Sequence, residues 1–207
     1  MSKFCETKVK ILNTAEKLFA ENGFSATPIS KIAEECSITK SLVFYHFNRK
    51  KDLLKNIIKL HFEEIRKNRD KMIERVVKKL ERDKIDDSGK FFIEEMIKIM
   101  FDNEHFWKLM FYEIIRDEEV WNYFKNFIKM WHDEVFTKLS EKGIVIKNKK
   151  QFIFTRMFNV IGPIMLYTIK KDEWNKYLDT NEKEVKNNFI KNFVKIIDGS
   201  NIRREKE

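Results

Sequence analysis

The side chains best suited to contact a charged partner lie between residues 39 and 51. They include ammonium and guanidinium groups, a hydroxyl, an imidazole and large apolar groups, at Lys40, Ser41, Leu42, Phe44, Tyr45, His46, Arg49, Lys50 and Lys51. Phosphates attract Lys and Arg and accept hydrogen bonds from polar side chains, and Leu or Phe can contact the methyl group of thymine. The stretch predicts binding to double-stranded DNA. A generic three-helix domain with a solvated basic surface stays open as the alternative.

Other kinds of chemistry lack the spacing that they need. None of the four histidines has a His or Cys three or four positions away, so we expect no metal site. The carboxylate pairs at 94–95 and 118–119 are adjacent in sequence, and on a helix such neighbours face different directions. The chain has no glycine-rich phosphate loop, nucleophile elbow or H-E-x-x-H motif. We therefore expect no catalytic residue, no metal and no cofactor.

Three short helices are predicted to position residues 39–51. The first covers residues 7–22, and Gly23 follows it as a residue that can adopt the left-handed conformation. The second begins at Thr27 and Pro28, a favourable N-cap and first position. After a short turn, Thr39 caps the third, whose Val43 and Phe47 point inward. Two helices joined by a tight turn predict a helix-turn-helix, in which the last helix enters the major groove.

This stretch resembles the TetR family of transcriptional regulators. The match in order, spacing and residue types runs through residues 15–24, 27–47 and 47–54, and the resemblance as a whole covers residues 8–60. It implies a one-component regulator that binds DNA as a homodimer. It also implies DNA contacts by phosphate-facing and base-facing side chains, at Thr27, Ser30, Lys40, Ser41, Leu42, Phe44, Tyr45, His46 and Lys50.

Three positions depart from the family pattern. Ser37 stands where the family usually has Gly, so the turn needs a mildly strained backbone or a different geometry. Ser41 replaces a common Gly, and Phe44 replaces a common Tyr, which removes a hydroxyl that often meets DNA. The operator sequence therefore does not carry over from relatives.

Composition predicts an all-α chain. The family resemblance implies how it is divided: an N-terminal three-helix DNA-binding domain and a C-terminal helical bundle for ligand binding and dimerisation. The 207 residues include only five Gly and two Pro, and the formal charge of +9 permits nucleic-acid binding. We expect the DNA-binding domain at 1–47, a connecting helix at 48–68, a regulatory domain at 69–200 and a frayed tail at 201–207. Further helices are expected at 70–83, 90–102, 105–116, 118–142, 149–171 and 181–198.

Three local features of the regulatory domain are also predicted. A helix break is expected at residues 86–89. The segment 144–146 is expected to be a loop, although its residues could pass for a strand. Gly162 and Pro163 should bend the helix 149–171, because Pro lacks the backbone donor and clashes with the preceding turn.

Aromatic and methionine side chains concentrate in the regulatory domain. Between helices they could line a pocket for a small, mostly apolar effector, and the candidates are Trp107, Met110, Phe111, Trp131, Phe158 and Met165. Plain core packing is the alternative for each. Arg156 and Lys170 could reach an anionic head group. Helices 149–171 and 181–198 carry enough apolar surface to predict the homodimer interface.

We expect a cytoplasmic protein. Neither cysteine has metal-like spacing, no secretory signal begins the chain, and no uninterrupted apolar run reaches the ~20 residues that span a bilayer. The predicted function is a ligand-responsive repressor on a palindromic operator. A helical scaffold that binds another protein, or a DNA-binding activator without a ligand, remain open.

Overall fold

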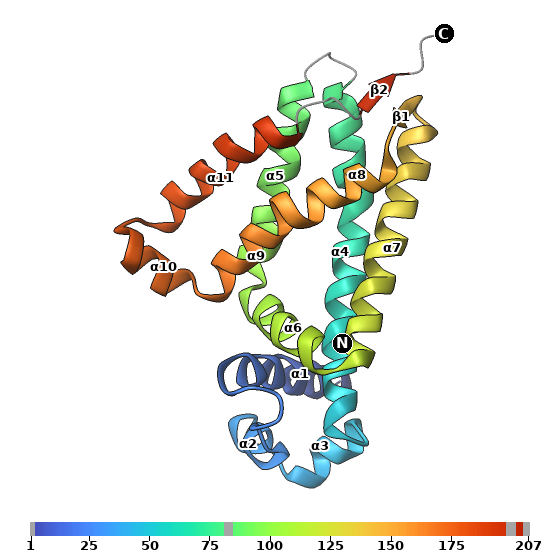
Figure 1. Cartoon of the computed structure of the whole chain (residues 1–207). Helices are drawn as coiled ribbons and strands as arrows, with labels where there is room; N and C mark the ends of the chain where they lie inside the picture. Colours follow the sequence, from blue (N-terminus) through green and yellow to red (C-terminus); the bar gives the residue numbers. More distant parts are fainter. Residues whose placement is uncertain (1–2, 81–84, 198–201, 205–207) are drawn as a thin grey trace. The chain divides into compact units, whose positions relative to one another are not determined.

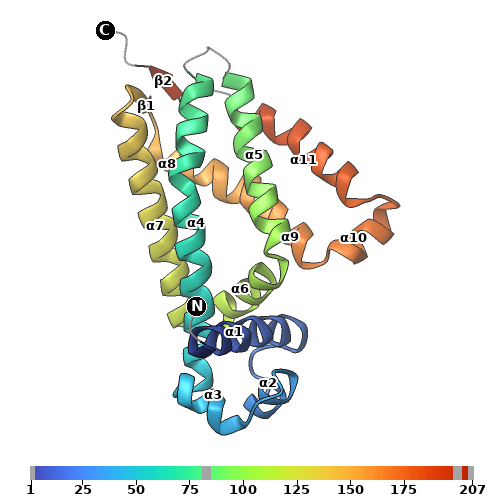
Figure 2. The same ribbon diagram turned by 180° about the vertical axis from the view of Figure 1, so that it is seen from behind.

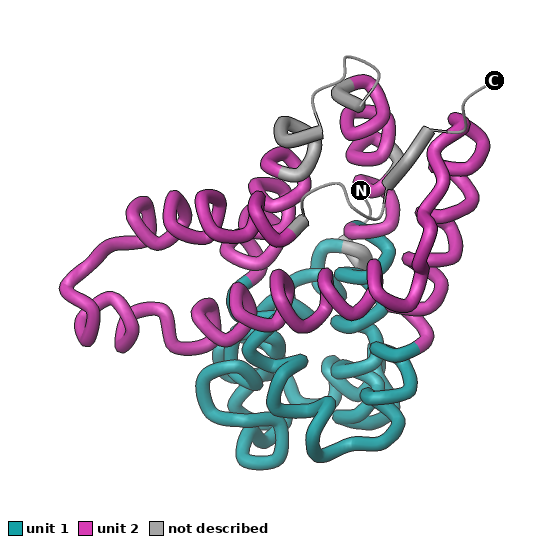
Figure 3. Tube along the Cα trace, turned by 45° about the horizontal axis from the view of Figure 1, so that its top comes forward, with its two compact units in different colours: residues 1–64, 104–125 teal, residues 65–103, 126–207 magenta. Residues whose placement is uncertain are grey.

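The computed structural model describes residues 3–80, 85–197 and 202–204, and almost all of them are helical (Figure 1). The predicted all-α fold class is confirmed. The chain divides into two compact units, each made of two separate stretches (Figure 3). Unit 1 contains residues 1–64 and 104–125, and unit 2 contains residues 65–103 and 126–207.

Unit 1 contains the predicted three-helix domain and adds three further helices to it, two of them only in part. It contains α1 (Lys3–Asn22), α2 (Ile29–Glu35), α3 (Lys40–His46), the first part of α4 (Lys50–Leu80), α6 (Glu104–Arg116) and the first residues of α7 (Glu118–Ser140). α1 packs against both α2 and α6. Its apolar stripe is buried, with Ile11 and Ala15 at 0% exposure. The unit therefore extends beyond residue 47, where the sequence pattern placed the end of this domain.

Unit 2 is a helical assembly with its own apolar core. It contains the rest of α4 and α7 together with α5 (Ile85–Asp102), α8 (Lys149–Phe154), the π-helix η1 (Thr155–Ile161), α9 (Gly162–Ile169), α10 (Lys171–Leu178) and α11 (Glu182–Ile197). α5 packs against α9 and α11. α4 and α7 run side by side in both views (Figures 1 and 2), and within unit 2 Arg69 of α4 pairs with Glu134 of α7.

Several predicted helix boundaries are wrong. α4 continues without a break to Leu80, although a separate helix was expected to begin at residue 70. The break expected at residues 86–89 lies inside α5. The helix predicted to run to residue 171 ends at Ile169, and α10 follows it as a separate short helix. The polar residues and the glycine at 86–89 do not end α5, because the packing of a helix's apolar face outweighs the propensity of single residues.

Residues 144–146 form a strand, which corrects the expected loop. Ile144–Ile146 (β1) pairs antiparallel with Ile202–Arg204 (β2), with Val145 opposite Arg203. The partner strand lies in the segment expected to be frayed, 58 residues farther along by sequence number, so no nearby run signalled it. Ile144 and Ile146 are buried and Val145 is half-buried, which is the alternation of a strand with one packed face.

A π-helical segment, η1, lies directly before Gly162 and Pro163, where the sequence predicts a bend. Pro163 has no N–H to donate within the helix. The backbone N–H of Gly162 donates to the carbonyl of Met157, five residues earlier, which is the π-helical pattern. A Cβ on Gly162 would lie 3.1 Å from that same carbonyl oxygen. The widened turn and the missing side chain together accommodate the proline.

The stretch Lys149–Ile169 is apolar on its outside as well as its inside. By length and composition it could cross a membrane, with a mean hydropathy of 1.4 and only 33% of its most apolar window buried. The stretch includes Lys149, Lys150 and Arg156, so it is not an uninterrupted apolar run of about 20 residues. The exposed apolar side chains include Phe154 (53% exposed), Phe158 (68%) and Leu166 (54%).

Candidate nucleic-acid interface

α3 is held by its inward face and its cap, and it leaves its outer face open. Val43 is fully buried and Phe47 is 4% exposed, so they anchor α3 to the core of unit 1. The side-chain oxygen of Thr39 accepts a hydrogen bond from the backbone N–H of Leu42 at 3.2 Å, as an N-cap does. A seven-residue helix with one cap and two anchors is positioned by the domain around it.

Most residues predicted to face DNA lie on the outer face of α3. Lys40 and Ser41 are exposed, Phe44 is 40% exposed and Tyr45 is 73% exposed. The ammonium group of Lys40 lies 5.8 Å from the centroid of the Phe44 ring, one turn away. The same helix brings Leu42 and His46 to half-buried positions, and Ser30 is exposed on α2. This gives a surface with a cation, a hydroxyl and aromatic edges next to one another.

The turn between α2 and α3 contains a residue in the left-handed conformation. Ser37 has φ +53°, and its N–H donates to the carbonyl of Glu34 at 2.8 Å. The next N–H, of Ile38, donates to Ala33 at 3.0 Å. The strained backbone predicted from the Ser at this position is confirmed. Lys10 of α1 supports the same turn, because its ammonium group donates to the carbonyl of Cys36 at 2.9 Å.

Replacing Ser37 by glycine should stabilise the protein. An L-residue with a Cβ pays about 1 kcal/mol or more in the left-handed region, and glycine avoids that cost but loses more chain entropy on folding. We expect Ser37→Gly to raise the free energy of unfolding by up to about 1 kcal/mol, a rise of roughly 2–4 °C in melting temperature. Ser37→Ala keeps the Cβ and should give no such rise. Equal melting temperatures for the two variants would contradict the strain.

Thr27 is buried, which corrects its expected contact with phosphate. Its exposure is 0%, and its hydroxyl lies within hydrogen-bonding distance of the carbonyls of Leu18 (3.1 Å) and Gly23 (2.9 Å). α2 is capped instead by Pro28, which has an extended backbone and offers no side-chain bond. The hydroxyl ties the loop after α1 to the end of that helix, a structural role that leaves no surface for DNA.

Lys50 also has partners within the protein. Its ammonium group donates to the carbonyl of Ser25 at 3.1 Å and lies 4.6 Å from the centroid of the Phe24 ring. Burial lowers the pKa of Lys50, and the nearby Glu113 acts in the opposite direction. A phosphate contact by Lys50 stays a prediction, and such a contact would compete with these bonds.

An ion-pair network that the sequence did not reveal holds the start of α4 to the turn between α6 and α7. Lys51 contacts Asp117 at 2.8 Å and Glu119 at 3.0 Å, and Lys55 contacts Glu119 at 2.5 Å. Hydrogen bonding to Lys51 lowers the pKa of Asp117, whose carboxylate also accepts from the backbone N–H of Glu119. The only advance signal was Asp117, an N-cap residue in front of a predicted helix. The network uses Lys51, so the basic cluster after α3 is largely paired internally.

Glu113 predicts a pH dependence of stability. It is 4% exposed, and burial raises the pKa of its carboxyl, opposed by Arg116 and Lys50 and reinforced by Asp117. A raised pKa in the folded state adds stability at low pH, and that stability is lost as the pH rises through the raised pKa. We therefore expect Glu113→Gln to be more favourable, relative to the parent protein, at pH 7 than at pH 4.

Urea unfolding of both proteins at the two pH values measures this difference. Glu118→Gln, an exposed glutamate five positions away, is the matched control and should show no such pH-dependent gain. If Glu113→Gln and Glu118→Gln respond to pH alike, the burial of Glu113 does not affect stability.

The six residues predicted to line an effector pocket lie in both units. Trp107 and Met110 are buried in unit 1 together with half-buried Phe111, whereas Trp131, Phe158 and Met165 belong to unit 2. Within unit 2, Phe158 is 68% exposed, and Trp131 packs against the apolar cluster that includes Phe136 and Phe152. The effector pocket stays a prediction.

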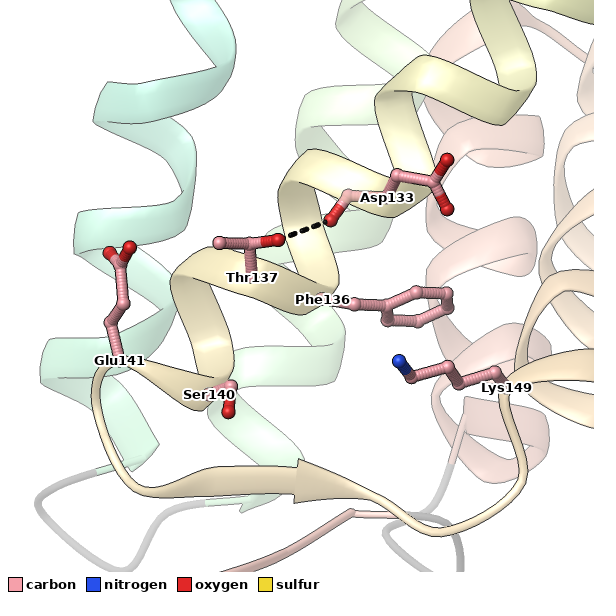
Figure 4. A pocket seen from close by; sticks show the side chains of 6 residues that line it. All are labelled: Asp133, Phe136, Thr137, Ser140, Glu141 and Lys149. Carbon is pink, nitrogen blue, oxygen red and sulfur yellow. Dashed lines mark hydrogen bonds between the residues drawn. The ribbon is translucent and has the colours of Figure 1, made fainter.

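A different pocket, of about 490 Å³, opens between the end of α7 and the start of α8. Its lining is mixed and mostly polar: Asp133, Phe136, Thr137, Ser140, Glu141 and Lys149. Figure 4 shows the carboxylates of Asp133 and Glu141 pointing away from each other, while Lys149 lies beside Phe136. Because its charged groups do not converge, the pocket offers no defined ligand geometry. Among the described residues, no group of three or more His, Cys, Asp or Glu is placed to hold a metal ion.

Comparison with known proteins identifies the N-terminal part of the chain. Residues 11–57 match the model of the family described as "Bacterial regulatory proteins, tetR family". Over 49 residues the chain is 47% identical to an uncharacterized HTH-type transcriptional regulator, YerO, of Bacillus subtilis (strain 168), covering 24% of this chain and 17% of YerO. Over 56 residues it is 36% identical to IcaR of Staphylococcus aureus (strain Newman), a negative regulator of a biofilm operon, covering 27% of this chain and 30% of IcaR. These matches span less than a third of the relatives' own length.

The whole fold has solved counterparts. The fatty acid degradation regulator FadR from Bacillus halodurans matches with a TM-score of 0.68 over 95% of this chain and 97% of FadR. The two sequences are 17% identical. At that identity the match establishes the common fold of both units and nothing about the ligand.

Proposed function

We propose that this chain, whose residues 11–57 match the family model of the tetR bacterial regulatory proteins, is a cytoplasmic, homodimeric repressor that binds a palindromic operator through α3. The observation that carries this proposal is the outer face of α3. Its cation, hydroxyl and aromatic side chains are exposed, while the inward residues Val43 and Phe47 are buried. Repression is proposed because one of the relatives, IcaR, is named a negative transcriptional regulator.

The exposed apolar side chains of α8, η1 and α9 support the proposed dimer. Phe154, Phe158 and Leu166 are more than half exposed on one continuous stretch. Large exposed apolar side chains in one region mark an interaction surface, and a two-fold dimer would bury the same patch of both subunits. On α11, which packs against α5, Phe193 is buried and Ile196 is 42% exposed. The proposed interface therefore centres on the stretch from Phe154 to Leu166.

Response to an effector requires two states of the dimer with unequal affinity for DNA. α4 and α7 each begin in unit 1 and continue into unit 2. A ligand that shifts these helices in unit 2 would change the separation of the two α3 helices, which must match about one turn of DNA, roughly 34–36 Å. We expect a coupling of about 1–3 kcal/mol, which is roughly 5- to 150-fold in operator affinity.

Selection of bound duplexes from a random library by the purified protein tests the proposed function. The result expected is one sequence with two inverted half-sites, whose centres lie about 10 base pairs apart or a multiple of that distance. Recovery of duplexes without a common sequence would contradict a specific regulator. A scaffold that binds another protein would recover no duplex at moderate salt.

A further inference from the structure

Arg156 in η1 is a cation held between two aromatic rings of unit 2. Its guanidinium carbon lies 3.3 Å from the ring centroid of Phe152 and 4.7 Å from that of Phe92. Both phenylalanines are buried, and Arg156 is half-buried. Rings over a guanidinium cover its flat faces and leave its N–H groups, which lie in the plane, to find acceptors.

Those N–H groups have no acceptor in the part of the chain that the structure describes. The contacts of Arg156 there are the two rings, and burial lowers its pKa to about 9, so it remains a cation at neutral pH. The buried Arg69 of the same unit differs, because it pairs with Glu134 and lies over Trp131. Because Arg156 is half-buried and has no counter-charge among the described residues, an anion that reaches it can form a charge-assisted pair with the guanidinium.

His132 is a second polar group of this cluster that lacks a partner. It is 2% exposed, its Nδ1 lies 2.8 Å from the carbonyl oxygen of Ile128, and its Nε2 has no hydrogen bond among the described residues. The ring centroids of His132 and Phe136 lie 6.1 Å apart, and those of Phe136 and Phe152 lie 5.4 Å apart. The guanidinium of Arg156 lies over the Phe152 ring. We call His132, Phe136, Phe152, Phe92 and Arg156 the Arg156 cluster.

We propose that the Arg156 cluster binds the carboxylate of a monocarboxylic acid with a hydrocarbon tail, and that such an acid is the effector. This inference rests on the proposed function, because only a regulator needs an effector. The edge of a guanidinium presents two parallel donors that match the two oxygens of a carboxylate. The Phe92 and Phe152 rings beside Arg156 favour a ligand whose remainder is apolar. A phosphate dianion fits less well, since one guanidinium leaves part of its charge uncompensated in apolar surroundings.

Bound anion should also change the protonation of His132. Burial lowers the pKa of His132, Arg156 lowers it further through its charge, and Asp133 acts in the opposite direction. A carboxylate on Arg156 cancels part of the repulsive charge, so the pKa of His132 rises and a proton is taken up from solvent. Binding is then tighter at lower pH, within the range where the acid itself stays ionised.

Isothermal titration calorimetry with dodecanoate, below its critical micelle concentration, tests the site. We expect the parent protein to bind dodecanoate about 10- to 150-fold more tightly than dodecanol, which has the same tail without the charge. Arg156→Met should remove that preference. Arg75→Met is the matched control, because Arg75 lies over Phe91 at 6.0 Å and is 61% exposed; it should keep the preference. Titration in two buffers of different ionisation enthalpy should show proton uptake that His132→Phe abolishes.

Several outcomes overturn the proposal, and they are distinct from failure of the proposed function. The comparison of the two ligands needs only the parent protein. Dodecanol binding as tightly as dodecanoate therefore refutes the carboxylate site even if Arg156→Met does not fold. Tighter binding of dodecyl phosphate refutes the choice of carboxylate. If dodecanoate binds through Arg156 but leaves affinity for the selected duplex unchanged, the acid is not the effector. Absence of any specific duplex refutes the proposed function, whatever dodecanoate does.

Discussion

Replacing Phe158 and Leu166 together by aspartate should convert the proposed dimer into a monomer and weaken operator binding by about 10²- to 10⁴-fold. Both side chains are more than half exposed, so the change should leave the subunit folded. In a dimer, residues 158 and 166 would be buried against the same patch of a second copy. Aspartates placed there would bring carboxylates of the two subunits together without a compensating positive charge. A monomer contacts one half-site and loses the gain from linking two binding events.

Light scattering at micromolar concentration and DNA-binding titrations measure these two effects. Ile115→Asp is the control, because Ile115 is 72% exposed on α6 in unit 1, and it should remain dimeric with parental affinity. A parent protein that is already monomeric while binding its duplex specifically would refute the proposed interface.

Lys40→Ala should weaken binding to the selected duplex and change which base pairs are preferred. Lys40 is exposed at the start of α3, and its ammonium group stays near the exposed Phe44 ring. A base contact is worth about 1–3 kcal/mol, and a dimer loses it in both half-sites. We expect an affinity lower by roughly 30-fold to 10⁴-fold.

Repeating the duplex selection with Lys40→Ala separates a base contact from a phosphate contact. Loss of preference at one position of each half-site indicates base recognition, whereas uniform weakening with a shallower salt dependence indicates phosphate contact. Lys59→Ala is the control, since Lys59 is exposed on α4 and lies 3.9 Å from Glu63; its effect should be small. Equal affinities for the parent and Lys40→Ala would show that α3 does not dock as proposed.

The helix-turn-helix was predictable because its determinants are local. The apolar spacing of α1, the Thr39 cap and the inward Val43 and Phe47 all lie within a few turns of one another. The strain at Ser37 could be predicted as well, since a position that needs a positive φ usually holds Gly. Strand β1 could not be predicted, because its partner follows more than fifty residues later and pairs through backbone groups, which carry no residue signature.

The exposure of some candidate DNA-contacting residues was predictable, whereas their contacts with DNA stay predictions. Lys40, Ser41, Phe44 and Tyr45 follow from helical spacing. Thr27 and Lys50 do not, because a hydroxyl or an ammonium group can bind a backbone carbonyl as readily as a phosphate, and only tertiary packing decides between them. The isolation of Arg156 is likewise invisible in sequence, since it depends on which carboxylates the fold brings near.

The most direct test of the central claim is the affinity of the protein for the selected duplex compared with a scrambled duplex of the same length and composition. Both are measured at about 0.15 M salt, where non-specific charge attraction is screened. A regulator that reads bases through α3 should bind the selected duplex at least about 10³-fold more tightly. Equal affinity for the two duplexes, falling alike as salt is raised, would contradict sequence-specific recognition and leave only the attraction of a basic chain for phosphate.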